Sequence, residues 1–213
     1  MLAGAGVTVS AAALDRAYDE SGSHLGRLWS RNRDVPVHEH IHTILAAVDP
    51  GLPARLSTDV LAALVDAYSR PVLMVPPAVD DGARTALLAL RARGYEVALV
   101  SNTMRTPGVM LRRLLEHFAL LECFAHTTFS DEVGVRKPDP EIFALTLRAL
   151  GSDAASAVHV GDDAILDVQG ARAAGMRVIQ VTSASLKALG ARRPDAVIPS
   201  LAGLADAVAR LDV

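Results

Sequence analysis

The first third of the chain places its apolar residues at the spacing of α-helices. Helices are predicted there over residues 11–29, 37–48 and from 58 onward. Ser10 and Ser57 stand where N-cap residues are expected, one position before the first and third helix. Neither an alternating run nor a short continuous apolar run, the two patterns typical of strands, interrupts these helices. We therefore predict that residues 1–75 form a helical unit.

After Pro71 the pattern changes to short continuous apolar runs that alternate with amphipathic helices. Strands are predicted over residues 96–100, 127–130, 157–160, 178–182 and 196–199. Helices are predicted over residues 81–93, 108–118 and 140–150. Further helices are predicted between the third strand and about residue 174, briefly after 182, and at the end of the chain. Continuous apolar strands between helices indicate a parallel sheet that is covered on both faces. The predicted fold class is therefore α/β, with a Rossmann-like core over residues 76–213.

Composition narrows the possible partners and location. The net charge of −3 gives no reason to expect nucleic acid as a partner, and the chain lacks the long apolar run of a membrane span. The uncharged opening residues lack the basic start of a signal peptide. Cys123 is the single cysteine, so an intramolecular disulfide is impossible, and we predict a cytoplasmic protein. The pattern leaves the oligomeric state unknown.

Polar residues with complementary chemistry follow three of the predicted strands. Ser101 and Asn102 come after the first, Lys137 lies in the loop beyond the second, and Asp162 follows the third, with Asp167 about one turn further on. Ligands of open parallel sheets bind at the carboxyl ends of the strands. A hydroxyl and an ammonium group suit phosphate oxygens, and carboxylates suit Mg²⁺. We therefore predict a site for phosphate and Mg²⁺ at this edge.

Each of these residues taken alone also has an ordinary structural interpretation. Ser101 and the pair Asp162 and Asp163 are typical of turns and helix caps. Lys137 could be a solvated loop charge, and Asp167 a solvated carboxylate on a polar helix face. Lys137 is nevertheless one of only two lysines in a chain that otherwise uses arginine. The shared order and location of these residues favour a common site.

Three strings in this part of the chain resemble motifs II, III and IV of the haloacid dehalogenase (HAD) superfamily. They are VALVSN, VGVRKPDPEIF and HVGDDAILDVQGARAAGM. The helical residues 8–75 resemble the C1 cap of that family. The resemblance therefore implies two domains, a cap at 1–75 and a core at 76–213. The resemblance implies a Mg²⁺-dependent phosphatase that acts on a small phosphorylated metabolite.

The resemblance also implies a role for each matching residue. Ser101 would hydrogen-bond the transferring phosphoryl group, and Asn102 would shape the phosphate-binding loop. Lys137 would neutralise the charge of the phosphate and the nucleophile. Asp162 would ligate Mg²⁺, and Asp167 would support the metal site or anchor Lys137.

The chain departs from the family at motif I, a strand ending in Asp-x-Asp. Its first aspartate attacks phosphorus and its second is the general acid and base. The 213 residues contain no Asp-x-Asp. In the family that strand lies between the strands that here end at Ser101 and Gly161, so we expect an interrupted sheet and an inactive chain. A misassigned start codon, a truncated gene, or a partner or local segment in the empty position would each explain this.

Other functions stay open from the sequence. A receiver domain uses similar residues, but its acidic pair comes first in the chain and its lysine last. A non-catalytic binding or remnant protein of the same fold is an alternative, as is a haloacid dehalogenase or phosphomutase of the superfamily. The string from Lys137 to Glu141 is more similar to phosphatase members. In the helical unit, His38, His40 and His42 suggest either a metal site or a solvated, substrate-facing surface, and Arg31, Arg33 and His38 are candidates for contact with the leaving group.

Overall fold

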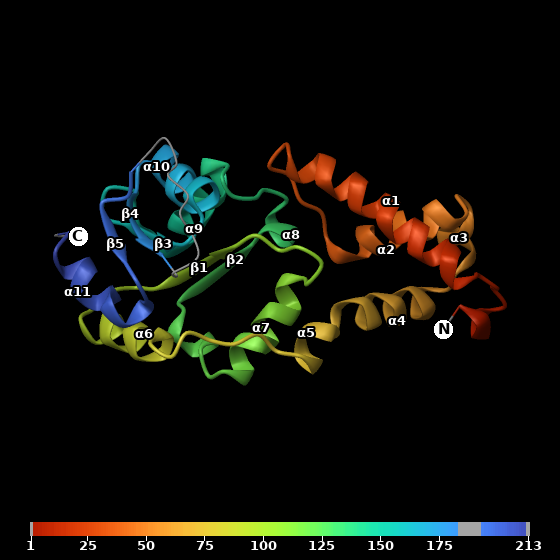
Figure 1. Cartoon of the computed structure of the whole chain (residues 1–213), viewed down its shortest axis with the longest axis horizontal. Helices are drawn as coiled ribbons and strands as arrows, with labels where there is room; N and C mark the ends of the chain where they lie inside the picture. The colour runs from red at the N-terminus through yellow and green to blue at the C-terminus, as the bar shows by residue number, and fades with distance from the viewer. Residues whose placement is uncertain (1, 183–192, 212–213) are drawn as a thin grey trace.

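The computed structural model describes residues 2–182 and 193–211 (Figure 1). Its first part is made of helices, which are η1 (Ala3–Ala5), α1 (Ala11–Trp29), α2 (Val37–Val48), α3 (Leu52–Arg55), α4 (Thr58–Ser69) and α5 (Pro71–Met74). Ser10 and Ser57 are confirmed as N-caps, because their side chains accept hydrogen bonds from the backbone N–H groups of Ala13 and Val60. Among the described residues, none of the helices combines the length and the apolar character that crossing a membrane requires.

The helical unit has an apolar core of its own. Its buried centre is formed by residues of α2, α3 and the turn after α3, namely Ile41, Leu45, Leu52 and Leu56. Residues of α4 such as Leu61 and Leu64 pack against this centre. The sequence did not predict the short helices α3 and α5. Both carry a proline in the first turn, where its missing N–H group is not needed.

The rest of the chain is an α/β unit with parallel strands. The strands are β1 (Ala98–Ser101), β2 (His126–Phe129), β3 (Val158–Gly161), β4 (Arg177–Val181) and β5 (Ala196–Ile198). They form two separate parallel ladders, β1-β2 and β3-β4-β5, rather than one continuous sheet. The ladder is thus interrupted between the strand that ends at Ser101 and the strand that ends at Gly161.

Helices cover both faces of these strands. The helices and turns are α6 (Ala83–Ala92), α7 (Gly108–His117), η2 (Leu121–Cys123), α8 (Ser130–Val133), α9 (Pro140–Leu150), η3 (Ala164–Gln169), α10 (Gly170–Ala173), η4 (Leu201–Gly203) and α11 (Leu204–Ala209). One core cluster joins α6 and α11 to Ile179 and Ile198 of β4 and β5. A second joins α9, η3 and α10 to Val178 of β4, with Val100 of β1 packed against it. This layered arrangement is visible in Figure 1.

The α/β fold class with parallel strands is confirmed, and most predicted elements begin or end within two residues of the observed ones. One predicted helix differs in kind, because the segment before Ala174 begins with η3, a short π-helix, before α10 continues. The short helix predicted after residue 182 falls outside the described residues.

Candidate active site

Asn102, which directly follows β1, fixes the position of the backbone of Lys137. The side-chain carbonyl Oδ1 of Asn102 accepts a hydrogen bond from the backbone N–H of Lys137 at 2.8 Å. Its amide Nδ2 donates to the backbone carbonyl of Lys137 at 2.9 Å. Ser101, the last residue of β1, is half-buried directly before Asn102. The structure therefore brings the three predicted phosphate-binding residues to one place.

The ammonium group of Lys137 connects this place to the segment after β3. Lys137 Nζ lies 2.6 Å from Asp167 Oδ1, and the side chains are 13% and 4% exposed. The same oxygen lies 2.9 Å from Nε2 of His159, and Asp167 Oδ2 accepts the backbone N–H of Asp163 at 3.0 Å. Burial raises the pKa of Asp167, but the hydrogen bond from His159 and the charge of Lys137 outweigh it and hold that pKa well below its usual range. Asp167 is therefore a charged anchor for Lys137.

The π-helix η3 accounts for the inward position of Asp167. Asp163 caps this segment, since its Oδ1 accepts the backbone N–H groups of Ile165 and Leu166 at 2.8 Å. Val168 N–H then reaches back five residues to the carbonyl of Asp163 at 3.1 Å, the wide turn of a π-helix. Asp167 is 3% exposed as a result. The cap interpretation is confirmed for Asp163, and the solvated-carboxylate interpretation is wrong for Asp167.

A glycine at position 161 is required by the close approach of Asp167. A Cβ at Gly161 would lie 2.2 Å from Asp167 Cγ, so the carboxylate would have to leave its place beside Lys137. We expect Gly161→Ala to lower the free energy of unfolding by about 1–3 kcal/mol, as overpacking does. Urea unfolding measures this, with Gly203→Ala as control, where a Cβ would meet only Ile198 at an ordinary 3.8 Å. Equal stability of the two variants would contradict the packing argument.

Among the described residues, the carboxylate of Asp162 suits Mg²⁺ as a ligand. Asp162 is exposed directly after β3, and its carboxylate bonds to no other described residue. Both oxygens of Asp167 already accept hydrogen bonds, which favours its anchoring role and leaves its role as a metal ligand a prediction. Within residues 2–182 and 193–211, no cluster of three or more His, Cys, Asp or Glu is arranged to hold a metal ion. Because Mg²⁺ needs only one or two carboxylates beside water and phosphate oxygens, Asp162 suits that ion as a partial site.

A buried network joins the helical unit to both loops of the site. Asp34, from the loop between α1 and α2, accepts hydrogen bonds at Oδ2 from Arg136 at 2.7 Å, Ser130 at 2.5 Å and Thr103 at 3.3 Å. Its Oδ1 accepts the indole N–H of Trp29 at 3.1 Å. We call these five residues the Asp34 joint. Arg136 directly precedes Lys137, and Thr103 follows Asn102, so the joint holds both loops against the helical unit.

Sequence reasoning missed His159 and the Asp34 joint. His159 stands within one of the quoted strings, but no role was predicted for it, since a histidine inside a strand is usually a satisfied core residue. Asp34 is an acidic loop residue with no local pattern to distinguish it. Only tertiary structure shows that Asp34 meets Arg136, 102 positions away, and that His159 meets Asp167 across the turn after β3.

The histidines of α2 do not share one surface. His38 and His42 are exposed, whereas His40 is buried. His40 contacts the hydroxyl of Tyr68, which also accepts a hydrogen bond from Arg105 at 3.1 Å. Burial lowers the pKa of His40. A solvated surface therefore describes His38 and His42, and the buried side chain of His40 does not share it.

The predicted leaving-group contacts are also exposed. Arg31 is exposed, and Arg33 is 55% exposed and pairs with Asp139 at 3.1 Å. A backbone bridge between Arg33 and Val135 lies close to the Lys137 loop. Arg33 is thus near the site, while contact of Arg31, Arg33 and His38 with a leaving group stays a prediction.

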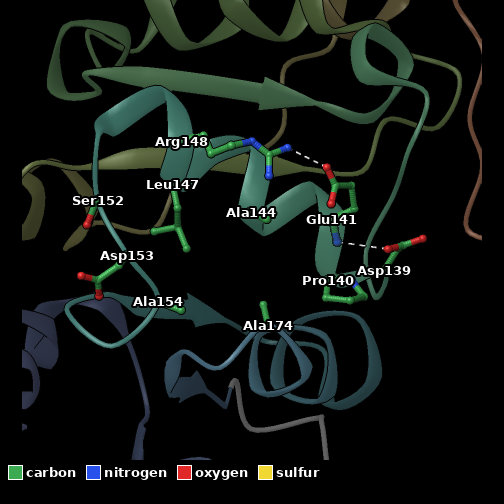
Figure 2. Close-up of a pocket in the computed structure, with 10 residues that line it drawn as sticks. All are labelled: Asp139, Pro140, Glu141, Ala144, Leu147, Arg148, Ser152, Asp153, Ala154 and Ala174. Carbon is green, nitrogen blue, oxygen red and sulfur yellow. Dashed lines mark hydrogen bonds and ion pairs between the residues drawn. The ribbon is translucent and has the colours of Figure 1, made fainter.

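A surface hollow of about 480 Å³ lies between α9 and the segments that carry Ala154 and Ala174 (Figure 2). Glu141 and Arg148 of α9 form an ion pair along it, and Asp139 caps the helix at one end. None of the candidate site residues Ser101, Lys137, Asp162 and Asp167 lines this hollow. The candidate site is therefore the polar cluster at the strand ends.

Known proteins share both the sequence pattern and the fold. The family model of the haloacid dehalogenase-like hydrolases matches residues 12–175. The mouse haloacid dehalogenase-like hydrolase domain-containing protein 3 is 36% identical over 137 residues, which are 64% of this chain and 51% of that protein. The glyceraldehyde 3-phosphate phosphatase of Pyrococcus abyssi is 36% identical over 100 residues, 46% of this chain and 40% of that protein. The chain thus spans about half or less of these relatives.

The crystal structure of 2-haloacid dehalogenase from Pseudomonas syringae has a TM-score of 0.69. It is 24% identical, and the match covers 96% of this chain and 83% of that one. At this identity the likeness extends to the fold alone.

Proposed function

Because this chain belongs to the haloacid dehalogenase-like hydrolases, we propose that its polar cluster is the phosphate-binding part of a phosphomonoester phosphatase. The proposed substrate is a small phosphorylated metabolite, as the name of the glyceraldehyde 3-phosphate phosphatase suggests for that relative. The observation that carries the proposal is the position of Lys137, held between Asn102 at the end of β1 and Asp167 beyond β3. A largely buried ammonium that is held in place suits a phosphoryl group. The hydroxyl of Ser101 suits it as well, because its one described bond is a long one of 3.4 Å to the backbone carbonyl of Asn102.

Each side chain of the cluster has a distinct task in this proposal. The hydroxyl of Ser101 donates a hydrogen bond to a phosphoryl oxygen, and Lys137 balances the negative charge that gathers there. Asp167 and His159 hold Lys137 in place, so its charge needs no reorganisation when the substrate arrives. Asp162 would hold Mg²⁺, which when bound offsets the charge of the phosphoryl oxygens.

The 213 residues do not contain the nucleophile in the expected form. Phosphoryl transfer in this proposal needs a carboxylate that bonds to phosphorus while the ester oxygen leaves and takes up a proton. The sequence has no Asp-x-Asp to provide it. We therefore propose that the chain as given binds phosphate but does not turn over phosphate esters. This same observation favours the alternative of a non-catalytic binding protein.

We propose that residues 1–75 act as a cap over the cluster. The Asp34 joint and the contacts of Arg105 with Tyr18 and Tyr68 support this, because both bring the helical unit against the loops after β1. A cap in this place would exclude water from the phosphoryl group and contact the leaving group. A cytoplasmic location remains a prediction from the single cysteine.

Phosphate binding and turnover test the proposed function separately. Titration calorimetry with inorganic phosphate and Mg²⁺ should detect binding to the chain, and Lys137→Met should weaken it about ten- to a hundredfold through loss of a charge-assisted bond. The control Arg148→Met removes an exposed charge on α9 and should leave binding unchanged.

Turnover of an aryl phosphate should be absent from the purified chain with or without Mg²⁺. Unaltered phosphate affinity in Lys137→Met would contradict the assigned site. Robust Mg²⁺-dependent turnover that Asp162→Ala abolishes would show that another residue serves as the nucleophile.

A further inference from the structure

Arg105 lies at the contact between the two units, and the proposed function gives it no part in binding. It belongs to the loop after β1, four residues after Ser101, and its guanidinium carbon lies 3.7 Å from the centre of the Tyr18 ring on α1. Its Nη1 donates a hydrogen bond to the hydroxyl of Tyr68 on α4 at 3.1 Å. Nδ1 of His40 on α2 contacts the same hydroxyl at 3.4 Å. We call these residues, Arg105, Tyr18, Tyr68 and His40, the Arg105 cluster.

The guanidinium of Arg105 has no carboxylate partner among the described residues. Other cations near the contact between the units each have one, at 2.6 to 3.1 Å: Lys137 pairs with Asp167, Arg136 with Asp34, and Arg33 with Asp139. Of the five N–H donors of an arginine, the bond to Tyr68 uses one. Arg105 therefore keeps an unbalanced positive charge and unused donors.

His40 adds no negative charge to the cluster. It is 2% exposed, and its Nε2 is buried without a hydrogen-bond partner among the described residues. Burial lowers the pKa of His40, and the charge of Asp34 raises it. The charges of Arg105 and Arg136 lower that pKa further, so the ring is neutral near pH 7.

Docking of the helical unit explains only part of this arrangement. The ring of Tyr18 and the hydroxyl of Tyr68 hold the guanidinium in place, but neither balances its charge. A charge that is partly removed from water without a counter-charge costs free energy. A guanidinium held in one position with unused donors suits a carboxylate or a phosphate, which it can bind through two parallel hydrogen bonds. Arg105 is half-buried and Tyr18 is 41% exposed, so the cluster is accessible from solvent.

The loop after β1 joins the Arg105 cluster to the phosphate-binding residues. Four residues of chain span at most about 14 Å, which limits the distance between the Cα atoms of Ser101 and Arg105. Between them, the backbone N–H of Thr103 donates to the hydroxyl of Ser130 at 2.8 Å, within the Asp34 joint. The loop is thus fixed at its middle by buried bonds. One small metabolite is long enough to reach both of its ends.

We propose that Arg105 binds a second anionic group, a carboxylate or a further phosphate, on the substrate whose phosphate ester lies beside Ser101 and Lys137. The inference rests on the proposed function, because it names the class of phosphorylated metabolite for the same site. Arg105 then selects esters that carry a second charge over esters of simple alcohols.

Three phosphate esters of similar length test this selection. Propyl phosphate has no second charge, 2-carboxyethyl phosphate has a carboxylate in place of the terminal methyl group, and 1,3-propanediol bisphosphate has a second phosphate. Titration calorimetry with the whole chain should show at least one charged ester binding about ten- to a hundredfold more tightly than propyl phosphate, as a charge-assisted pair provides. The order of the two charged esters distinguishes the carboxylate from the phosphate.

Arg105→Met should remove this preference, so that the variant binds the three esters with similar affinity. The control Arg70→Met removes an exposed charge from the helix that carries Tyr68 and should keep the preference. Equal binding of the three esters by the parent chain, or a preference that survives Arg105→Met, would overturn the inference and leave the proposed function intact. Binding of none of the esters would contradict both.

Proton NMR of His40 provides a measurement that a docking role of Arg105 would not change. An anion bound beside Arg105 offsets the charge that lowers the pKa of His40, so this pKa should rise when a charged ester binds and not when propyl phosphate binds. The exposed His38 and His42 serve as controls in the same spectra. An unchanged His40 pKa with a tightly bound charged ester would show that the second charge lies elsewhere, against the inference.

Discussion

Replacing Asp34 with alanine is expected to lower the free energy of unfolding by about 3–5 kcal/mol, the usual cost of breaking a buried ion pair from one side. The side chain of Asp34 is fully buried and that of Arg136 is 7% exposed, so water cannot replace the lost partner. The indole of Trp29 and the hydroxyl of Ser130 would lose their acceptor as well. Urea unfolding followed by circular dichroism measures the change.

A matched substitution tests whether the loss of stability is specific to the buried pair or common to acidic residues in ion pairs. Asp66 pairs with Arg70 on the surface of α4, where the two side chains are 42% and 59% exposed. Asp66→Ala should cost no more than about 1 kcal/mol, since exposed pairs contribute little. If Asp34→Ala cost as little as Asp66→Ala, the Asp34 joint would not stabilise the protein. Arg136→Met combined with Asp34→Ala should cost less than the sum of the two, because neither charge is then left alone.

Replacing Lys137 with methionine is expected to destabilise the protein by a similar 3–5 kcal/mol near neutral pH. The substitution keeps the unbranched aliphatic shape and most of the length of the side chain. It leaves the carboxylate of Asp167 buried with only His159 and a backbone N–H as partners. The exposed Arg148→Met again serves as the control, and its effect should stay within about 1 kcal/mol.

The effect of Lys137→Met should depend on pH in a defined direction. The folded-state pKa of Asp167 lies below its unfolded value of about 3.9, so its charge stabilises the fold above that pH. This contribution is lost as the pH falls through the folded pKa. The variant raises the folded pKa of Asp167 and removes much of that contribution. Its stability gap from the parent chain should therefore be largest at pH 6–7 and shrink below about pH 4. A gap that stays constant from pH 7 to pH 3 would show that Lys137 acts by packing alone.

Local signals made much of the fold predictable from the sequence. Helix α9 has the predicted bounds because Asp139 caps it, Pro140 opens its first turn, and Gly151 ends it at a φ of 64°. The strands of the α/β unit were predictable for a similar reason, since continuous apolar runs indicate strands that are buried on both faces. The predicted site residues Ser101 and Lys137 could be grouped because parallel strands bring their carboxyl ends to one edge.

Other features depend on contacts that no local pattern contains. Asp34 and Arg136 meet across 102 positions of sequence, and each taken alone resembles an ordinary loop charge. Asp167 was predicted to lie on a helix about one turn after Asp162, where the ordinary interpretation of a carboxylate is that it faces solvent. The extra residue in the turn of η3 directs it inward, and its partner His159 comes from a neighbouring strand. Sequence periodicity does not distinguish a π-helix from an α-helix over six residues.

The Asp34 joint also has an optical consequence. Trp29 is the only tryptophan of the chain, its indole N–H donates to Asp34, and the guanidinium of Arg136 lies 4.6 Å from the centre of its ring. All intrinsic tryptophan emission therefore comes from the contact between the helical unit and the α/β unit. Separation of the two units would expose the indole to water and shift its emission to longer wavelength, without any label.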